Sequence, residues 1–371
     1  MDALTASVAQ GIKLKELGEV VRADLQSDTF EISDWSVRSL SNKGIVNPQG
    51  LWLIEGQGHD PAGERCWSVV LKVLKRTDDG ARQDDAWKRE IRVVQSGLLD
   101  QLIAVKAPRY YRLEESADEA RLWMEYVDTC RTASWEMKDY AFAAQQLGRW
   151  AGAWSQRALV IQPWMNRDQH VNWYGWADPE RDLMFELNQK YVQGKLRQRY
   201  LRLWEERDVF RAALDSLPHV LSHFDCQRRN LAIRCEDGRE ELVLVDWAEF
   251  GPAPLGAELL HLIGMSAALL EYPMESMAEL DAVTFGAYLG GLRDVGWTGS
   301  AEAVRLAFSA YMAVWFGLVV PSALSFWCSP EATEFSLQQY GFAGEELYVK
   351  VLPLLQFSLD YADQARAIMC S

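Results

Sequence analysis

Two aspartates and an asparagine occur at a spacing that suits phosphoryl transfer. The segment HFDCQRRN places Asp225 five positions before Asn230, and the β-run that follows ends at Asp246. A first carboxylate can orient an attacking hydroxyl and accept its proton, while an amide oxygen and a second carboxylate are hard ligands for Mg²⁺ on nucleotide phosphates. For this segment alone, the alternative is a helix-flanking turn that Asp225 caps and Asn230 fills.

A lysine in the middle of an apolar run points to the same chemistry. Lys72 lies within VVLKVLKR, where a buried ammonium is costly unless it has a charge partner. Glu90, in the helical segment that follows, is the candidate partner, and a Lys–Glu pair that presents its ammonium to nucleotide phosphates is what kinases need. The alternatives are an edge-strand lysine that reaches water, and Lys75 as the residue with this role.

The elements that must position these residues change in type near residue 128. The first part is predicted to follow the order β-β-β-α-β-β, and the second part is mainly helical with one short β-pair. The predicted strands cover 31–44, 49–60, 66–76 and a pair within 110–127, and the predicted helices include 84–99, 138–157 and 188–214. Breaks are expected at Pro273, Pro321 and Pro353. We therefore expect an α+β fold with a β-rich lobe over 1–128 and a larger α-helical lobe over 129–371.

Charge and cysteine usage restrict the partners. The 371 residues carry a formal net charge of −15 and a sequence pI near 4.9, which argues against a nucleic-acid-binding protein and favours cationic substrates. The six cysteines form no CxxC pair, so we expect neither a disulfide framework nor a zinc site, but reduced thiols in a cytoplasmic protein. The first residues show no signal-peptide pattern.

One uncharged stretch is long enough to cross a bilayer. Residues 307–328 contain no charged side chain, yet serines, a glycine and Pro321 interrupt them. We expect a buried core helix that breaks near Pro321, and no membrane association; a single membrane span is the alternative.

The chain resembles the aminoglycoside phosphotransferase family, small-molecule kinases with a two-lobed protein-kinase-like fold. The resemblance is carried by VVLKVLKR, KREI, WMEYV, HFDCQRRNLAI and LVLVDWAEFGPAPLGAELLHL, which occur in the family's order between residues 70 and 262. It implies an enzyme that uses ATP and Mg²⁺ to phosphorylate a hydroxyl of a small molecule, such as an aminoglycoside-like antibiotic or a metabolite. A non-catalytic nucleotide-binding scaffold is the alternative, and the pattern specifies no oligomeric state.

The resemblance implies a role for each matching residue. Lys72 would contact the α- and β-phosphates and Glu90 would hold it, Met124 would line the adenine pocket, and the backbone of Glu125 and Val127 would pair with the adenine edge. The roles in the second lobe are a catalytic base at Asp225, metal ligands at Asn230 and Asp246, and a structural Glu258 where the family usually has aspartate.

The chain also departs from the family and protein-kinase patterns around the catalytic and phosphate-binding loops. Phe224 stands where the family often has glycine, and Gln227 stands where protein kinases have a lysine, so Arg228 or Arg229 could supply positive charge near the γ-phosphate instead. The alternative for these arginines is a solvated basic turn. No GxGxxG loop is present, so the phosphate-covering turn would be 41–44 or 47–50.

The short interval after Asp246 distinguishes small-molecule kinases from protein kinases. Only 12 positions separate Asp246 from Glu258 (258 − 246), which leaves no room for an activation loop. The acceptor is therefore expected to be a small molecule. A Trp-rich insert at 163–179 is expected to wedge against the helical lobe or to form a lid.

Overall fold

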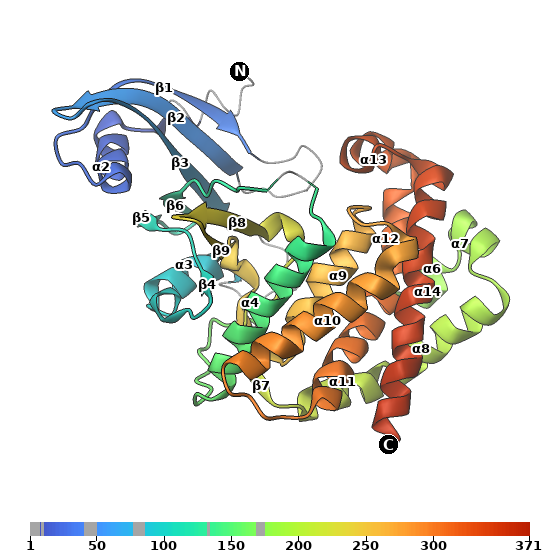
Figure 1. Cartoon of the computed structure of the whole chain (residues 1–371). Helices are drawn as coiled ribbons and strands as arrows, with labels where there is room; N and C mark the ends of the chain where they lie inside the picture. Colours follow the sequence, from blue (N-terminus) through green and yellow to red (C-terminus); the bar gives the residue numbers. More distant parts are fainter. Residues whose placement is uncertain (1–7, 9–10, 41–49, 77–85, 132–133, 168–174) are drawn as a thin grey trace. The chain divides into compact units, whose positions relative to one another are not determined.

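The computed structural model describes residues 8, 11–40, 50–76, 86–131, 134–167 and 175–371. The chain forms two compact units (Figure 1). The N-terminal unit comprises residues 1–100 and 107–128, and the C-terminal unit comprises residues 101–106 and 129–371.

A five-stranded antiparallel sheet forms the centre of the N-terminal unit. Its strand order is β1-β2-β3-β6-β5. The strands are β1 (Glu31–Ser39), β2 (Gly50–Asp60), β3 (Gly63–Lys75), β6 (Glu119–Glu125) and β5 (Tyr110–Glu115), and the helices of this unit are α2 (Leu14–Leu25), η1 (Ala86–Lys88), α3 (Arg89–Gln95) and η2 (Leu99–Gln101). The order β-β-β-α-β-β expected from the sequence is present, preceded by α2.

The two faces of this sheet are covered by different helices. Side chains of β3 alternate between the faces, as they must at a period of two residues. Val69 and Leu71 pack in a cluster with Leu17 of α2, whereas Val70 packs in the opposite cluster with Ile91 of α3. The even-numbered positions of β3 therefore face α3.

Two small sheets and most of the helices make up the C-terminal unit (Figure 1). One sheet has the order β4-β9-β8, in which β4 is parallel to β9 and the β8–β9 hairpin is antiparallel. The other sheet pairs β10 with β7. The strands are β4 (Val105–Lys106), β7 (His219–Ser222), β8 (Leu231–Glu236), β9 (Arg239–Leu244) and β10 (Gly251–Pro254).

The helices of the C-terminal unit pack closely enough for glycine to be required where α4 meets α10. A Cβ atom built on Gly148 of α4 would lie 2.1 Å from the carbonyl oxygen of Tyr288 on α10. The helices and helical turns are α4 (Met137–Ser155), α6 (Pro179–Asp182), α7 (Glu186–Tyr191), α8 (Gly194–Ser216), η3 (Arg228–Asn230), η4 (Trp247–Glu249), α9 (Glu258–Ala268), η5 (Met274–Ser276), α10 (Met277–Asp294), α11 (Ala301–Met312), η6 (Ala313–Gly317), α12 (Leu318–Trp327), η7 (Pro330–Ala332), α13 (Thr333–Tyr340) and α14 (Gly344–Met369).

The long uncharged stretch is part of a mostly buried helix that does not break at Pro321. Residues 301–327 are helical throughout, and 83% of the most apolar window is buried. The expected break at Pro321 is wrong. In a regular α-helix, Pro321 would clash with the carbonyl of Gly317, four residues earlier. Here the wider π-helical turn η6 ends at Gly317, which relieves that clash. By length and composition this is the one helix among the described residues that could cross a membrane.

Two other helix boundaries also differ from the prediction. Pro353 lies inside α14 instead of ending a helix, so apolar packing on both sides of it outweighs the lost hydrogen bond. The single helix expected over 188–214 is divided into α7 and α8 at Gly194, whose φ of +53° suits glycine. The expected break at Pro273 is present, between α9 and η5.

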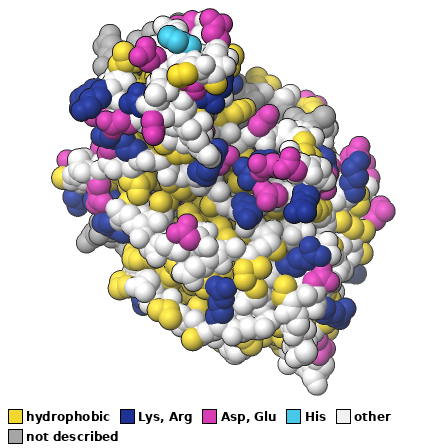
Figure 2. Space-filling view, turned by 60° about the vertical axis from the view of Figure 1, so that its left-hand side comes forward, with side chains coloured by type: hydrophobic (Ala, Val, Ile, Leu, Met, Phe, Trp, Pro, Cys, Tyr) yellow, Lys and Arg dark blue, Asp and Glu magenta, His cyan; other side chains and the backbone are white. Residues whose placement is uncertain are grey.

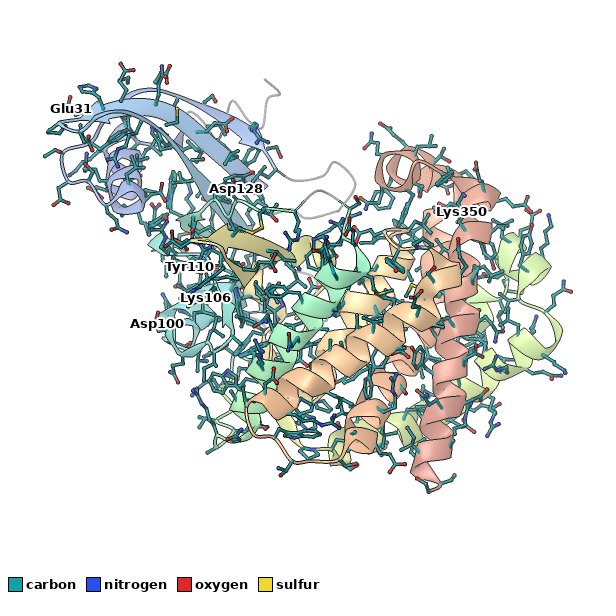
Figure 3. The ribbon with its side chains drawn as sticks, viewed as in Figure 1. Glu31, Asp100, Lys106, Tyr110, Asp128 and Lys350 are labelled. Carbon is teal, nitrogen blue, oxygen red and sulfur yellow. A yellow bond between two sulfur atoms is a disulfide. The ribbon has the colours of Figure 1, made fainter. Side chains whose placement is uncertain are left out.

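The expectation of six reduced cysteines is wrong for one pair. Cys130 and Cys235 form a disulfide within the C-terminal unit, with their Cα atoms 5.8 Å apart (Figure 3). The backbone N–H of Cys130 donates to Ile233, which aligns the segment after β6 with β8. The two cysteines are 105 residues apart, so their pairing leaves no local pattern. The prediction of a cytoplasmic location rested partly on reduced thiols, and this disulfide removes that argument.

Candidate active site

A buried ion pair joins β3 to α3 in the N-terminal unit. Lys72 Nζ lies 2.5 Å from Glu90 Oε2, and both side chains are almost fully buried. Lys72 shares the α3-facing side of the sheet with Val70, which explains how the strand period brings it to Glu90. Tyr110, labelled in Figure 3, donates its hydroxyl to Glu90 Oε1 at 3.3 Å. The carboxylate is thus oriented from two sides.

The competing lysine is placed differently. Lys75 ends β3 and is exposed to solvent, so it does not share the buried environment of Lys72.

The residues predicted to contact the adenine lie on β6 and just after it. Met124 is buried on β6, where it pairs with Val70 across the strands. Glu125 ends the same strand and Val127 lies two residues beyond it. The structure therefore puts the four residues predicted to contact the nucleotide on β3, on β6 and on the segment that follows β6.

A hydrogen-bonded loop after β7 carries the predicted catalytic aspartate. The backbone N–H of Asp225 donates to His223 Nδ1 at 3.2 Å, so the ring proton is on Nε2, which donates to the carbonyl of Val245 at 3.0 Å. The N–H of Val245 in turn donates to the carbonyl of Asn230. His223 thereby ties the loop to the end of β9, where Asp246 follows.

Two amides orient the Asp225 carboxylate. Gln227 Nε2 donates to both carboxylate oxygens at 3.0 and 3.1 Å, and Asn230 Nδ2 donates to Oδ2 at 2.7 Å. Asn230 Nδ2 also lies 3.1 Å from the backbone carbonyl of Asp225. Both donors are neutral, so they direct the carboxylate without neutralising it as the lysine of a protein kinase would.

Burial and neighbouring acidic side chains raise the pKa of the Asp225 carboxyl group. Desolvation, followed by the charges of Asp246 and Glu249, raises the pKa of Asp225 to about 7. A general base works best when its pKa lies near the operating pH. The structure thus gives the Asp225 carboxylate an orientation and a raised pKa that suit a base for a substrate hydroxyl.

The predicted metal ligands suit a cation that arrives with a nucleotide. Because Asn230 Nδ2 donates to Asp225, its amide oxygen is directed away from that carboxylate. Asp246, with φ of +63°, follows β9 and acts electrostatically on Asp225. Among the described residues no group of three or more His, Cys, Asp or Glu could hold a metal alone. Mg²⁺ is usually coordinated by one or two protein oxygens, with phosphate oxygens and water completing the coordination sphere, and Asn230 and Asp246 could supply two such oxygens.

Both arginines of the loop pair with the same carboxylate and are only partly exposed. Arg228 donates to both oxygens of Glu271 at 2.9 and 2.7 Å, and Arg229 Nε donates to the same carboxylate at 2.7 Å. Glu271 follows α9 and is largely buried. Arg228 and Arg229 therefore form a three-residue ion cluster with Glu271 at η3. Their role near a γ-phosphate stays a prediction.

Glu258 lies in the interior of the C-terminal unit, where it is hydrogen-bonded to α10. It begins α9 and is fully buried, and Tyr288 of α10 donates its hydroxyl to Oε2 at 2.8 Å. The same hydroxyl accepts the N–H of Gly256 at 3.0 Å. Burial raises the pKa of Glu258. These contacts match the structural role expected of this residue.

Several supporting residues had no clear sequence signal. Tyr110, Glu271 and Tyr288 belong to elements far from their partners in the chain, and only their surroundings reveal their contacts. The expected phosphate-covering turns at 41–44 and 47–50, Gly50 excepted, lie outside the described residues, as do Asp168, His170 and Trp173 of the Trp-rich insert. Trp164 of that insert stacks on Phe250, with ring centroids 6.4 Å apart.

Comparison with known proteins confirms the resemblance. A model of the phosphotransferase enzyme family matches residues 67–299, more than half of the chain. No curated protein matches the sequence. The matched range includes Lys72, Glu90, Asp225, Asn230 and Asp246.

Solved structures of similar fold belong to small-molecule kinases. A microcompartment-associated aminopropanol kinase superposes with a TM-score of 0.57 at 14% identity, covering 93% of this chain and 98% of that one. Amicoumacin kinase, solved with AMP-PNP, Ca²⁺ and its ligand, gives 0.55 at 14% identity, with 87% and 88% covered. An aminoglycoside phosphotransferase from Alicyclobacillus acidocaldarius gives 0.53 at 14%, with 89% and 92% covered. The protein-kinase-like fold expected from the sequence is confirmed.

Proposed function

Because this chain belongs to the phosphotransferase enzyme family and is a small-molecule kinase, we propose that it transfers the γ-phosphate of ATP to a hydroxyl of an amino-bearing small molecule, with Mg²⁺ as the metal. The observation that carries this proposal is the Asp225 carboxylate, oriented by two neutral amides and raised in pKa to about 7. The intact set Lys72, Glu90, Asp225, Asn230 and Asp246 argues against the non-catalytic scaffold.

In the proposed reaction Asp225 orients the acceptor hydroxyl and takes its proton as the oxygen attacks the γ-phosphorus. A new P–O bond forms, and the bond from the γ-phosphorus to the bridging oxygen breaks, which releases the nucleoside diphosphate. Positioning and electrostatic stabilisation supply most of the rate in such transfers. No covalent enzyme intermediate is required.

The N-terminal unit would bind the nucleotide. Lys72 would contact the α- and β-phosphates, and Glu90 would fix its ammonium. Met124 would line the adenine pocket, while the carbonyl of Glu125 and the N–H of Val127 would pair with the adenine edge. The family resemblance supports these roles.

The metal would be held by the C-terminal unit. Asn230 Oδ1 and the Asp246 carboxylate would hold Mg²⁺, whose positive charge would offset the negative charge of the phosphates. Amicoumacin kinase was solved in complex with AMP-PNP and Ca²⁺, which supports a nucleoside triphosphate and a divalent ion here.

An amino-bearing acceptor is favoured by charge. The net charge of −15 attracts cations over a long range, although basic and acidic side chains are interspersed on the face drawn in Figure 2. Proteins of this fold include kinases named for amicoumacin and aminopropanol and a phosphotransferase named for aminoglycosides. These substrates belong to those proteins, and they define the chemical class to test first.

The test is release of ADP from Mg-ATP over a panel of aminoglycosides, macrolides, sugars and amino alcohols. We expect one class to stimulate release, and Asp225→Ala to abolish the stimulation while ATP still raises the melting temperature. Asp208→Ala, which removes an exposed carboxylate of α8, is the matched control and should behave like the wild type. Stimulated release that persists in Asp225→Ala would contradict the assignment of the base.

A further inference from the structure

The peptide before Asp225 has an unusual backbone conformation. Phe224 has a φ of +66°, in the left-handed region that bulky L-residues rarely adopt. Such a conformation persists only where the surroundings hold it in place. The carbonyl of Phe224 accepts a hydrogen bond from His261 Nδ1, and His261 is a buried residue of α9.

His261 faces the catalytic loop with a single polar atom. Its Nδ1 atom is hydrogen-bonded to the Phe224 carbonyl and lies 3.8 Å from Asp225 Oδ1. Burial lowers the pKa of His261 to about 4, so the neutral ring carries its one proton on Nδ1. The atom therefore serves as a fixed donor to the peptide that carries Asp225.

An aromatic cluster fixes the His261 ring in turn. Trp315 meets the ring edge to face, with centroids 4.7 Å apart, and the Phe224 ring contacts Tyr311 at 5.4 Å and Trp315 at 6.3 Å. Trp315 lies in η6, the π-helical turn within residues 301–327. Such turns are frequent at functional sites. In this chain the widened turn places Trp315 against His261.

We propose that His261 is a positioning residue for the phosphoryl transfer: its Nδ1–H holds the Phe224 peptide in the left-handed conformation and so directs the Asp225 carboxylate, while Trp315 fixes the imidazole ring. This inference rests on the proposed function. It also accounts for a phenylalanine at a position where glycine would adopt the same φ without cost. The Phe224 side chain completes the cluster that orients His261.

Two substitutions of nearly equal shape separate hydrogen bonding from packing. In His261→Asn the amide nitrogen occupies a place close to that of Nδ1, whereas His261→Leu keeps the branching and removes the donor. For each variant we would measure the melting temperature, kcat and KM for acceptor-dependent transfer, and hydrogen–deuterium exchange over residues 223–230.

The expected result is a tenfold or greater fall in kcat for His261→Leu with KM for ATP changed less than twofold. Exchange over 223–230 should be faster in this variant, and His261→Asn should restore both kcat and slow exchange. Equal behaviour of the two variants, with kcat following only their melting temperatures, would overturn the proposal. If the wild-type protein transferred no phosphate, the proposed function would fail, and the exchange measurement would still decide whether His261 holds the loop.

Discussion

Lys72 Nζ and Glu90 Oε2 lie 2.5 Å apart inside the N-terminal unit, with side chains only 8% and 1% exposed. The opposite charges stabilise each other in an interior that disfavours a buried charge. Lys72 is expected to contact the nucleotide phosphates, and its burial is stabilised by Glu90. The same pair therefore contributes both to stability and to the proposed nucleotide binding.

Removing one member of this pair should be costly. Glu90→Gln removes the carboxylate that lies against the buried ammonium of Lys72, and we expect a loss of about 3 kcal/mol in the free energy of unfolding together with weaker ATP binding. Urea denaturation and calorimetric titration with ATP measure these two effects. Lys75→Met, which removes an exposed lysine of the same strand, is the control and should change neither quantity appreciably.

The double substitution Lys72→Met/Glu90→Leu tests whether the pair exists for stability or for binding. Apolar replacements of similar size often cost little or even stabilise a protein. We expect the double variant to be more stable than Glu90→Gln and to have lost ATP binding. A double variant that binds ATP as tightly as the wild type would remove Lys72 from the nucleotide site.

The raised pKa of Asp225 predicts a specific pH dependence of stability. The unfolded chain loses this proton near pH 4, whereas the folded protein retains it until about pH 7. Between these values the folded state binds the extra proton, so this group makes stability fall as pH rises from 4 to 7. Asp225→Asn cannot ionise and so avoids this loss of stability, and we expect it to be more stable than the wild type at pH 8.

Thermal unfolding at pH 5 and pH 8 without nucleotide would check this prediction. The stability gained by Asp225→Asn should be clearly larger at pH 8 than at pH 5. A variant that is less stable than the wild type at both pH values would show that burial does not strain this carboxylate.

The ion cluster at the loop predicts a different effect for Glu271. Glu271→Gln leaves Arg228 and Arg229 close together with no carboxylate, so we expect a loss of about 2 kcal/mol in stability. The matched control is Glu275→Gln, which removes an exposed carboxylate nearby. Equal melting temperatures for Glu271→Gln and Glu275→Gln would show that the ion cluster of Glu271 does not stabilise the protein.

The disulfide predicts a thiol count. Without reductant, denatured protein should react with thiol reagents at the four cysteines outside the pair, Cys66, Cys226, Cys328 and Cys370, and after reduction at all six. Because the bond closes a loop of about 100 residues, Cys130→Ser/Cys235→Ser should lose about 4 kcal/mol of stability. Six reactive thiols before reduction would show that the bond does not form.

Local pattern was sufficient to predict the strands of the N-terminal unit and the loop that carries Asp225. A lysine among apolar β-residues predicted the Lys72–Glu90 pair, because the strand period and the following helix restrict where an ammonium can find a partner. The spacing from Asp225 to Asn230 likewise restricts the two side chains to one turn, where they are hydrogen-bonded.

Contacts between distant segments were beyond the reach of such patterns. Nothing near Cys130 indicates Cys235, and nothing near Arg228 indicates Glu271. The break expected at Pro353 failed because packing on both sides of it compensates for the lost hydrogen bond, and the break expected at Pro321 failed because the π-helical turn η6 ends at Gly317. His261 showed no metal-ligand spacing, and only the fold reveals that its partner is the Phe224 carbonyl.

The central claim is that Asp225 acts as the base in phosphoryl transfer. The most direct measurement is the rate of ADP formation with the acceptor that the panel identifies, in wild-type protein and in Asp225→Asn, with Mg-ATP affinity measured for both. We expect the rate to fall by a factor of about 10² to 10⁴ while the affinity changes less than threefold. Asp225→Asn with a rate close to that of the wild type would contradict the account.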